Sequence, residues 1–177
     1  MKKDKGYIHI YCGEGKGKTS ILNGSAMRAK GAGLNVLYFR FLKNRPTSEN
    51  VMLEKLGIKI TNFYESSTKF VWEMDEQEVQ IFKDETYRGY KEIKNALKDE
   101  AVDVIFIDEL LGSVENGFIK KDELIKDLIE RKNHIEIFLS GRFSFPELDE
   151  IADLISVIQP KKHYMDIGVN GRKGIEY

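Results

Sequence analysis

The residues with the clearest chemical potential lie in a glycine-rich loop between a short β-rich run and a helical pattern. The loop reads Gly13-Glu14-Gly15-Lys16-Gly17-Lys18-Thr19. Glycines allow successive backbone N–H groups to turn towards phosphate oxygens. Lys18 adds a mobile positive charge, the Thr19 hydroxyl suits Mg²⁺, and the first helical turn, which includes Ser20, adds its dipole. The loop is therefore predicted to bind the phosphates of a nucleotide, and a strand-to-helix turn without a ligand is the alternative.

The loop departs at one position from the common pattern G-x-x-x-x-G-K-[ST]. That pattern has a glycine where this chain has Cys12, so the first glycine, Gly13, comes one position late. The loop is correspondingly shorter and carries an additional lysine, Lys16. We expect an altered placement of the phosphates, which argues against a simple ATPase. Cys12 itself is expected to fill the end of the strand rather than to act as a nucleophile.

A second candidate site follows the apolar run 104–107, which ends in Asp108 and Glu109. In P-loop proteins an acid at this place completes the Mg²⁺ shell opposite the threonine hydroxyl. The alternative is that the acids only cap the next helix. Both are predicted as metal ligands together with Thr19, and the sequence does not decide which carboxylate contacts the metal, directly or through water.

Phe70 and Trp72 form an aromatic pair between a weak strand pattern and a long helical one, and Trp72 is the only tryptophan of the chain. Two rings at this spacing are compatible with a surface for a flat ligand. On spacing alone, however, packing of the tryptophan in the core is favoured.

Composition limits the function further. The chain has 177 residues, of which 41% are hydrophobic and 32% charged, and this predicts one globular domain over residues 1–177. With a formal net charge of −1, no strong field favours nucleic acid as a partner. The apolar runs are too short to cross a bilayer, so no membrane is expected. A lone Cys12 excludes a disulfide framework and fits a cytoplasmic protein.

Strand-like and helix-like patterns alternate along the chain. The β-rich runs cover 7–12, 35–41, 59–63, 102–107, 135–139 and 154–158, and the helical patterns cover 19–30, 75–100 and 121–131. Asp75 and Glu78 could form a capping box at the start of the long helix. Near-continuous apolar strands between amphipathic helices predict an α/β fold, a mostly parallel sheet with helices on both faces. Ligands of such sheets bind at the carboxyl ends of the strands.

Several segments together resemble the P-loop ATP:corrinoid adenosyltransferases, the cob(I)alamin or cob(I)yrinic acid a,c-diamide adenosyltransferase family. The matching segments, in family order, are residues 13–19, 27–31, 41–43, 70–73, 108–110, 141–142, 152–154, 162–163 and 174–177. The departures are Arg40, where the family commonly has glutamine, Ser140, where threonine is frequent, and the turn at 44–46.

The resemblance implies a RecA-like P-loop fold, usually as a homodimer. It implies transfer of the 5′-deoxyadenosyl group of ATP to the Co(I) centre of a reduced corrinoid, such as cobalamin or cobinamide, with release of triphosphate and with Mg²⁺ or Mn²⁺ as cofactor. A flavin-type reductant is a candidate partner. By position, Lys18 and the loop amides bind triphosphate, Thr19 and Glu109, with Asp108, hold the metal, and Phe70 and Trp72 lie near the lower face of the corrin.

Two other functions stay open at the level of the residues alone. A P-loop kinase or NTPase would act at the γ-phosphate and produce ADP, whereas a non-catalytic module would bind ATP without turnover. The aromatic pair and the C-terminal motif at 174–177 are the features that favour adenosyl transfer over both.

Overall fold

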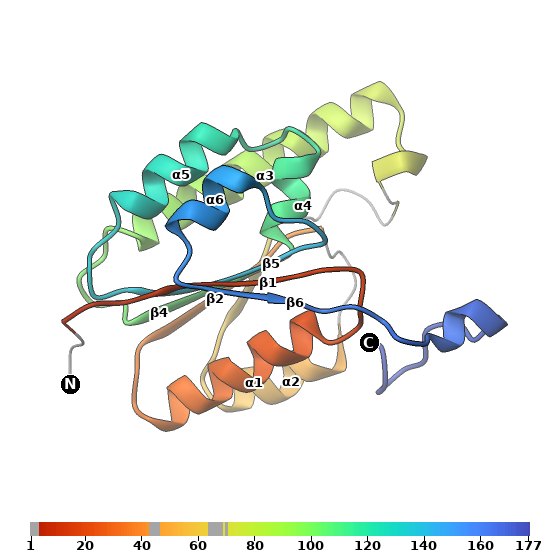
Figure 1. The fold of residues 1–177 in the computed structure, drawn as a ribbon, viewed down its shortest axis with the longest axis horizontal. Helices are drawn as coiled ribbons and strands as arrows, with labels where there is room; N and C mark the ends of the chain where they lie inside the picture. Colours follow the sequence, from red (N-terminus) through yellow and green to blue (C-terminus); the bar gives the residue numbers. More distant parts are fainter. Residues whose placement is uncertain (1–3, 43–46, 64–68, 70) are drawn as a thin grey trace.

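The computed structural model describes residues 4–42, 47–63, 69 and 71–177. Within these residues six parallel strands form one sheet in the order β3-β2-β4-β5-β1-β6 (Figure 1). The strands are β1 (Ile8–Cys12), β2 (Val36–Arg40), β3 (Ile60–Asn62), β4 (Val104–Asp108), β5 (Glu136–Ser140) and β6 (Leu154–Val157). The predicted parallel α/β sheet is confirmed.

Helices cover both faces of the sheet, as predicted. Figure 1 shows α1 and α2 on one face and α3, α4, α5 and α6 on the other. Their bounds are α1 (Lys18–Gly31), α2 (Ser48–Lys55), α3 (Glu76–Ala96), α4 (Leu110–Glu115), α5 (Lys121–Ile129) and α6 (Pro146–Ile151). Two single-turn 3₁₀ helices, η1 (Val71–Glu73) and η2 (Tyr164–Ile167), complete the described elements.

The long helix α3 begins where its sequence predicts. Asp75 is the N-cap, its carboxylate accepts from the Glu78 N–H, and the Glu78 carboxylate accepts from the Asp75 N–H, which completes the capping box. Phe82, Tyr90 and Ile93 lie on its buried face. The helix ends at Ala96, somewhat before the end of the predicted pattern.

The short helices α2, α4 and α6 were not among the predicted elements. Each has between six and eight residues, so its sequence is too short to display a helical period. In α2, for example, Leu53 is the buried residue. These helices depend on tertiary packing rather than on their own pattern.

The strand order determines which strand ends lie together. Because β5 lies between β1 and β4, the loop after β1 and the acids after β4 flank the end of β5. The register pairs Arg40, the last residue of β2, with Asp108, the last residue of β4, and pairs Tyr11 of β1 with Ser140, the last residue of β5. Polar side chains from four segments therefore meet at the carboxyl ends of the strands, the location expected for ligands in such folds.

The strand β6 is an edge of the sheet, beside β1. Leu154, Ile155 and Val157 are 39%, 40% and 61% exposed, which leaves an apolar strand edge partly uncovered. Among the described residues, no helix has both the length and the apolar character needed to span a membrane.

Candidate active site

The glycine loop is held against the residue that follows β6. The Gly15 N–H donates to the Ile158 carbonyl over 2.8 Å, and the Ile158 N–H donates to the Cys12 carbonyl over 2.7 Å. Gly13 has φ +111°, and a Cβ at this position would lie 2.3 Å from the Ile158 oxygen. Backbone conformation and close approach both require a glycine at position 13.

Lys18 and the start of α1 are directed by the same loop. The Lys18 ammonium donates to the Gly13 carbonyl over 2.6 Å and to the Gly15 carbonyl over 2.9 Å, so the side chain curls back over the loop. Gly17, with φ +123°, is the N-cap residue of α1 and has no side chain to cap the helix. The first-turn N–H groups and the ammonium therefore face the region where phosphate is expected.

A pocket of about 440 Å³ lies beside this loop. Its walls come from the loop, from the first turns of α1 and α2, from the residue after β4 and from residues 164–177, called the C-terminal segment below. The lining residues are Gly15, Lys16, Gly17, Lys18, Thr19, Ser20, Asn23, Thr47, Ser48, Glu49, Glu109, Gly174, Ile175, Glu176 and Tyr177. Of the predicted phosphate-binding residues, Gly13 and Glu14 are not in this wall but line a second hollow with Arg142 and Phe143.

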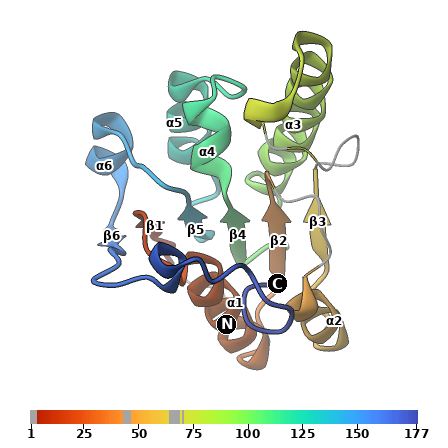
Figure 2. The same ribbon diagram turned by 90° about the vertical axis from the view of Figure 1, so that its right-hand side faces the viewer.

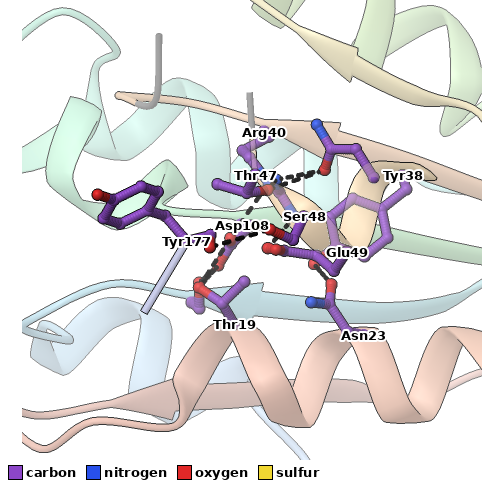
Figure 3. A network of polar contacts seen from close by, with 11 residues as sticks. Thr19, Asn23, Tyr38, Arg40, Thr47, Ser48, Glu49, Asp108 and Tyr177 are labelled. Atoms are coloured by element: carbon purple, nitrogen blue, oxygen red, sulfur yellow. Dashed lines mark hydrogen bonds and ion pairs between the residues drawn. The ribbon is translucent and has the colours of Figure 1, made fainter. Parts of the chain in front are cut away.

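Asp108 is the centre of a hydrogen-bond network below the pocket (Figure 3). Its carboxylate is fully buried. The Thr19 hydroxyl donates to Oδ2 over 3.0 Å, and the Ser140 hydroxyl donates to Oδ1 over 2.6 Å. The Ser140 oxygen in turn accepts the Glu109 backbone N–H over 2.9 Å. Asp108 thereby connects the start of α1, the end of β5 and the backbone of its own neighbour.

Glu109 lies on the pocket wall, half-buried, whereas Asp108 lies beneath it. The backbone of Glu109 adopts φ +62°, a left-handed conformation that is uncommon for a residue other than glycine. Such strain persists where the surrounding structure imposes it, and it concentrates at functional sites. Here it places the N-cap residue of α4 at the edge of the pocket.

The donor set fits a small divalent cation. Thr19, Asp108 and Glu109 supply one hydroxyl and two carboxylates, the hard oxygen ligands that Mg²⁺ prefers. Among the described residues no group of three or more His, Cys, Asp or Glu could form an all-protein metal cage. At nucleotide sites Mg²⁺ takes its other ligands from phosphates and water, so a small protein donor set is sufficient.

The C-terminal segment closes the pocket from the other side, and Figure 2 shows it running past the start of α1 towards α2. The Lys16 ammonium donates to Glu176 and to the Tyr164 hydroxyl, each over 2.7 Å, and the Arg172 N–H donates to Glu176 over 2.6 Å. Hydrogen bonds from Arg172 and then Lys16 hold the pKa of Glu176 well below its ordinary range. The contribution of this cluster to the free energy of unfolding is complete above the ordinary glutamate pKa of about 4.3. It is lost only as the pH falls towards the lower pKa that Glu176 has in the folded protein.

The end of this segment contacts α2, where the Ser48 hydroxyl donates to the Tyr177 carbonyl over 3.0 Å. The wall residues of α2 were not predicted, because nothing in the short sequence of this helix indicates a site. Asn23 was also missed, although it lies four residues after Thr19 and hence on the same helix face. That spacing could have identified it. Its Oδ1 accepts from the Tyr38 hydroxyl over 2.8 Å.

The predicted aromatic pair falls largely outside the described residues. Phe70 is not described, and of Trp72 only the backbone, within η1, is described. Nearby, Phe82 and Phe118 pack edge to face with 5.3 Å between ring centroids. Val71 and other apolar side chains pack against them, so the region adjoining η1 is apolar.

Residues 4–177 match the family ATP:corrinoid adenosyltransferase BtuR/CobO/CobP. Corrinoid adenosyltransferase CobA of Salmonella typhimurium is 32% identical over 177 residues, with 99% of this chain and 88% of that protein covered. Corrinoid adenosyltransferase of Escherichia coli K12 is 31% identical, over 98% of this chain and 87% of that protein. Among solved structures, the cytoplasmic domain of EssC has a TM-score of 0.49 and 16% identity, over 95% of this chain and 34% of that chain.

The fold and the site thus define a P-loop nucleotide-binding protein. The chain belongs to the ATP:corrinoid adenosyltransferase family. It is an enzyme of the transferase class, as the sequence motifs predicted.

The glycine loop makes a first prediction. Gly13→Ala is expected to destabilise the protein by about 1–3 kcal/mol from backbone strain alone, and to weaken ATP binding, because the new Cβ collides with the Ile158 carbonyl. Urea unfolding and ATP titration measure the two effects. Gly24→Ala is the matched control: no described residue outside its own helical turn lies within 4 Å of its Cβ position in α1, so a gain of about 0.5–1 kcal/mol is expected. Equal effects of both substitutions would contradict this account of the loop.

Proposed function

We propose that this enzyme transfers the 5′-deoxyadenosyl group of ATP to the Co(I) centre of a reduced corrinoid, with triphosphate as the leaving group. The observation that carries the proposal is the pocket wall shared by Lys18, Thr19 and Glu109 in a chain of this family. A γ-phosphate transferase would use similar parts, but the first loop glycine here comes one position late, which favours a different placement of the phosphate chain.

The protein has two tasks in this reaction. Triphosphate leaves readily only if its charge is neutralised, and Lys18, Lys16 and the loop amides line the place where that charge would develop. Co(I) is itself a strong nucleophile, so no protein base is required. The other task is to align the ribose C5′ with cobalt and to exclude water, for which the C-terminal segment is well placed.

The metal cofactor is proposed to be Mg²⁺ or Mn²⁺, held by Thr19 and Glu109, with Asp108 acting directly or through another ligand. When bound, it neutralises part of the charge on the departing triphosphate. The hydroxyl and the two carboxylates at this strand end support the assignment. The corrinoid is proposed to bind beside η1, with Phe70 and Trp72 at its lower face.

Further proposals concern partners and location. A homodimer is supported by the partly uncovered apolar edge at β6, since an exposed apolar strand edge commonly pairs with another chain. A flavin-type reductant that supplies Co(I) and a cytoplasmic location follow from the resemblance. The buried, free thiol of Cys12 agrees with a reducing compartment. Residues 1–177 are proposed to form one domain.

The phosphate role of Lys18 is tested by Lys18→Ala. Incubated anaerobically with ATP, Mg²⁺ and cob(I)alamin, the wild-type protein should release triphosphate and adenosylated corrinoid, and the variant should be about a hundredfold slower or worse. Lys30→Ala, in the last turn of the same helix, is the control and should keep the wild-type rate. ADP as the product would instead favour the kinase or NTPase, and no turnover a binding module.

The metal role of Glu109 is tested against that of Asp108. Glu109→Gln should raise the Mg²⁺ concentration needed for half-maximal activity much more than Asp108→Asn does, because Glu109 lines the pocket and Asp108 lies beneath it. A Mg²⁺ titration of both variants at saturating ATP measures the difference. The opposite ranking would assign direct coordination to Asp108, and equal small effects would leave both acids as structural caps.

The aromatic pair is tested by the oxidation state of the corrinoid. An apolar wall under the ring has no lone pair for cobalt and disfavours a lower axial ligand, which eases reduction of Co(II) to Co(I). Trp72→Ala should lose most activity with Co(II) corrinoid and a mild reductant, and much less with Co(I) made beforehand by a strong reductant. Equal losses in both assays, together with a lower Tm, would identify Trp72 as a core residue.

A further inference from the structure

Arg40 ends β2 inside the protein, where a charged side chain is rare. It is 1% exposed, and the register of the sheet places it opposite Asp108. A buried guanidinium is stable only if opposite charges and hydrogen-bond acceptors surround it. Its surroundings therefore indicate what it does.

Hydrogen bonds and ion pairs hold the guanidinium (Figure 3), and its carbon lies 5.5 Å from the centroid of the Tyr38 ring. Nη1 donates to the Thr47 hydroxyl over 2.9 Å and to the Asn50 side-chain oxygen over 2.8 Å. Nε lies 3.5 Å from Asp108 Oδ2, and Nη2 lies 3.5 Å from Glu49 Oε1. Nε and Nη2 are buried and make no hydrogen bond among the described residues. Towards both carboxylates Arg40 thus acts mainly as a charge.

Both oxygens of Asp108 are engaged by the network. Oδ1 accepts from Ser140 over 2.6 Å, and Oδ2 accepts from Thr19 over 3.0 Å while facing Arg40. A hydroxyl that donates its proton to Asp108 keeps its oxygen as an acceptor or metal ligand on its other side. Thr19 and Glu109 line the pocket, whereas the Asp108 carboxylate is fully buried beneath it.

From this geometry we infer that Arg40 is a positioning residue, an internal cation that keeps Asp108 as a hydrogen-bond acceptor and leaves direct metal coordination to Thr19 and Glu109. The inference rests on the proposed metal site. A divalent cation bound directly to Asp108 Oδ2 would lie close to the guanidinium, and the two positive charges would repel each other in a buried, weakly screened environment. Asp108 then orients Thr19 and, through Ser140, the backbone of Glu109.

The inference predicts a gain in metal affinity when the cation is removed. Mn²⁺ binding would be measured by electron paramagnetic resonance in the wild-type, Arg40→Gln and Arg40→Lys proteins, with and without ATP and without corrinoid. Arg40→Gln should bind Mn²⁺ at least about fivefold more tightly than the wild type in one or both of the two arms, with ATP and without ATP, because no internal cation opposes the metal. Arg40→Lys keeps the charge and should stay near the wild-type affinity.

A merely structural role for Arg40 predicts a different result. Arg40→Gln would then bind Mn²⁺ equally or more weakly in both arms, and that outcome overturns the inference, as does equal tightening in Arg40→Gln and Arg40→Lys. Arg131→Gln controls for the loss of a partly buried arginine, because Arg131 donates to the carbonyls of Gly6, Leu128 and Ile135 away from the pocket. It should lower the Tm without changing Mn²⁺ affinity.

Three further variants keep the inference testable even if Arg40→Gln fails to fold. Glu109→Gln should weaken Mn²⁺ binding in the presence of ATP at least about fivefold more than Asp108→Asn, and the reverse ranking overturns the inference. Thr19→Val tests the metal site itself. If it leaves Mn²⁺ binding unchanged, the proposed metal site is wrong, and this failure is distinct from a failure of the role assigned to Arg40.

Discussion

The buried carboxylate of Asp108 is the constraint on which the rest of the site depends. It cannot be buried without compensation, and it receives hydrogen bonds from Thr19 and Ser140 and the charge of Arg40. These partners come from α1, β5 and β2, so one carboxylate connects three segments that are far apart in the sequence. Through Ser140 it also fixes the strained backbone of Glu109 at the pocket wall. Shared contacts thus link the groups of the site to one another, and such links favour a preorganised site.

The glycine loop has a second support that is independent of Asp108. Ile158, which follows the edge strand, contacts the backbone of Gly13 and Gly15, so the loop is held by a residue that does not line the pocket. From the pocket side, Lys16 bonds to Glu176 of the C-terminal segment. The region after β6 therefore contacts the loop at two places, through Ile158 and through Glu176. Through these contacts a chain segment without a strand or a long helix comes to line the pocket.

Much of the site could be predicted from the sequence because its parts are local. The loop, Lys18 and Thr19 are contiguous, and the acids Asp108 and Glu109 end an obvious apolar strand. The relation between these acids could not be predicted. Neighbouring residues on a strand end have the same local signal, and only burial beneath the pocket separates Asp108 from Glu109. Asn23 could be predicted from its helical spacing, four residues after Thr19. The contribution of α2 to the pocket wall could not, because it depends on contacts with the C-terminal segment, which is distant in the sequence.

By itself, the sequence determined the alternation of apolar strands and amphipathic helices, the capping box at Asp75, the glycine-rich loop and the family, since these depend on short-range patterns and contiguous motifs. The tertiary structure decided the strand order, the depth of each acid and the environment of Arg40. These features arise from parallel pairings between strands separated by long crossovers. A residue's own sequence neighbours do not specify which distant strand end it will face, and the charge beside Asp108 is set by that pairing.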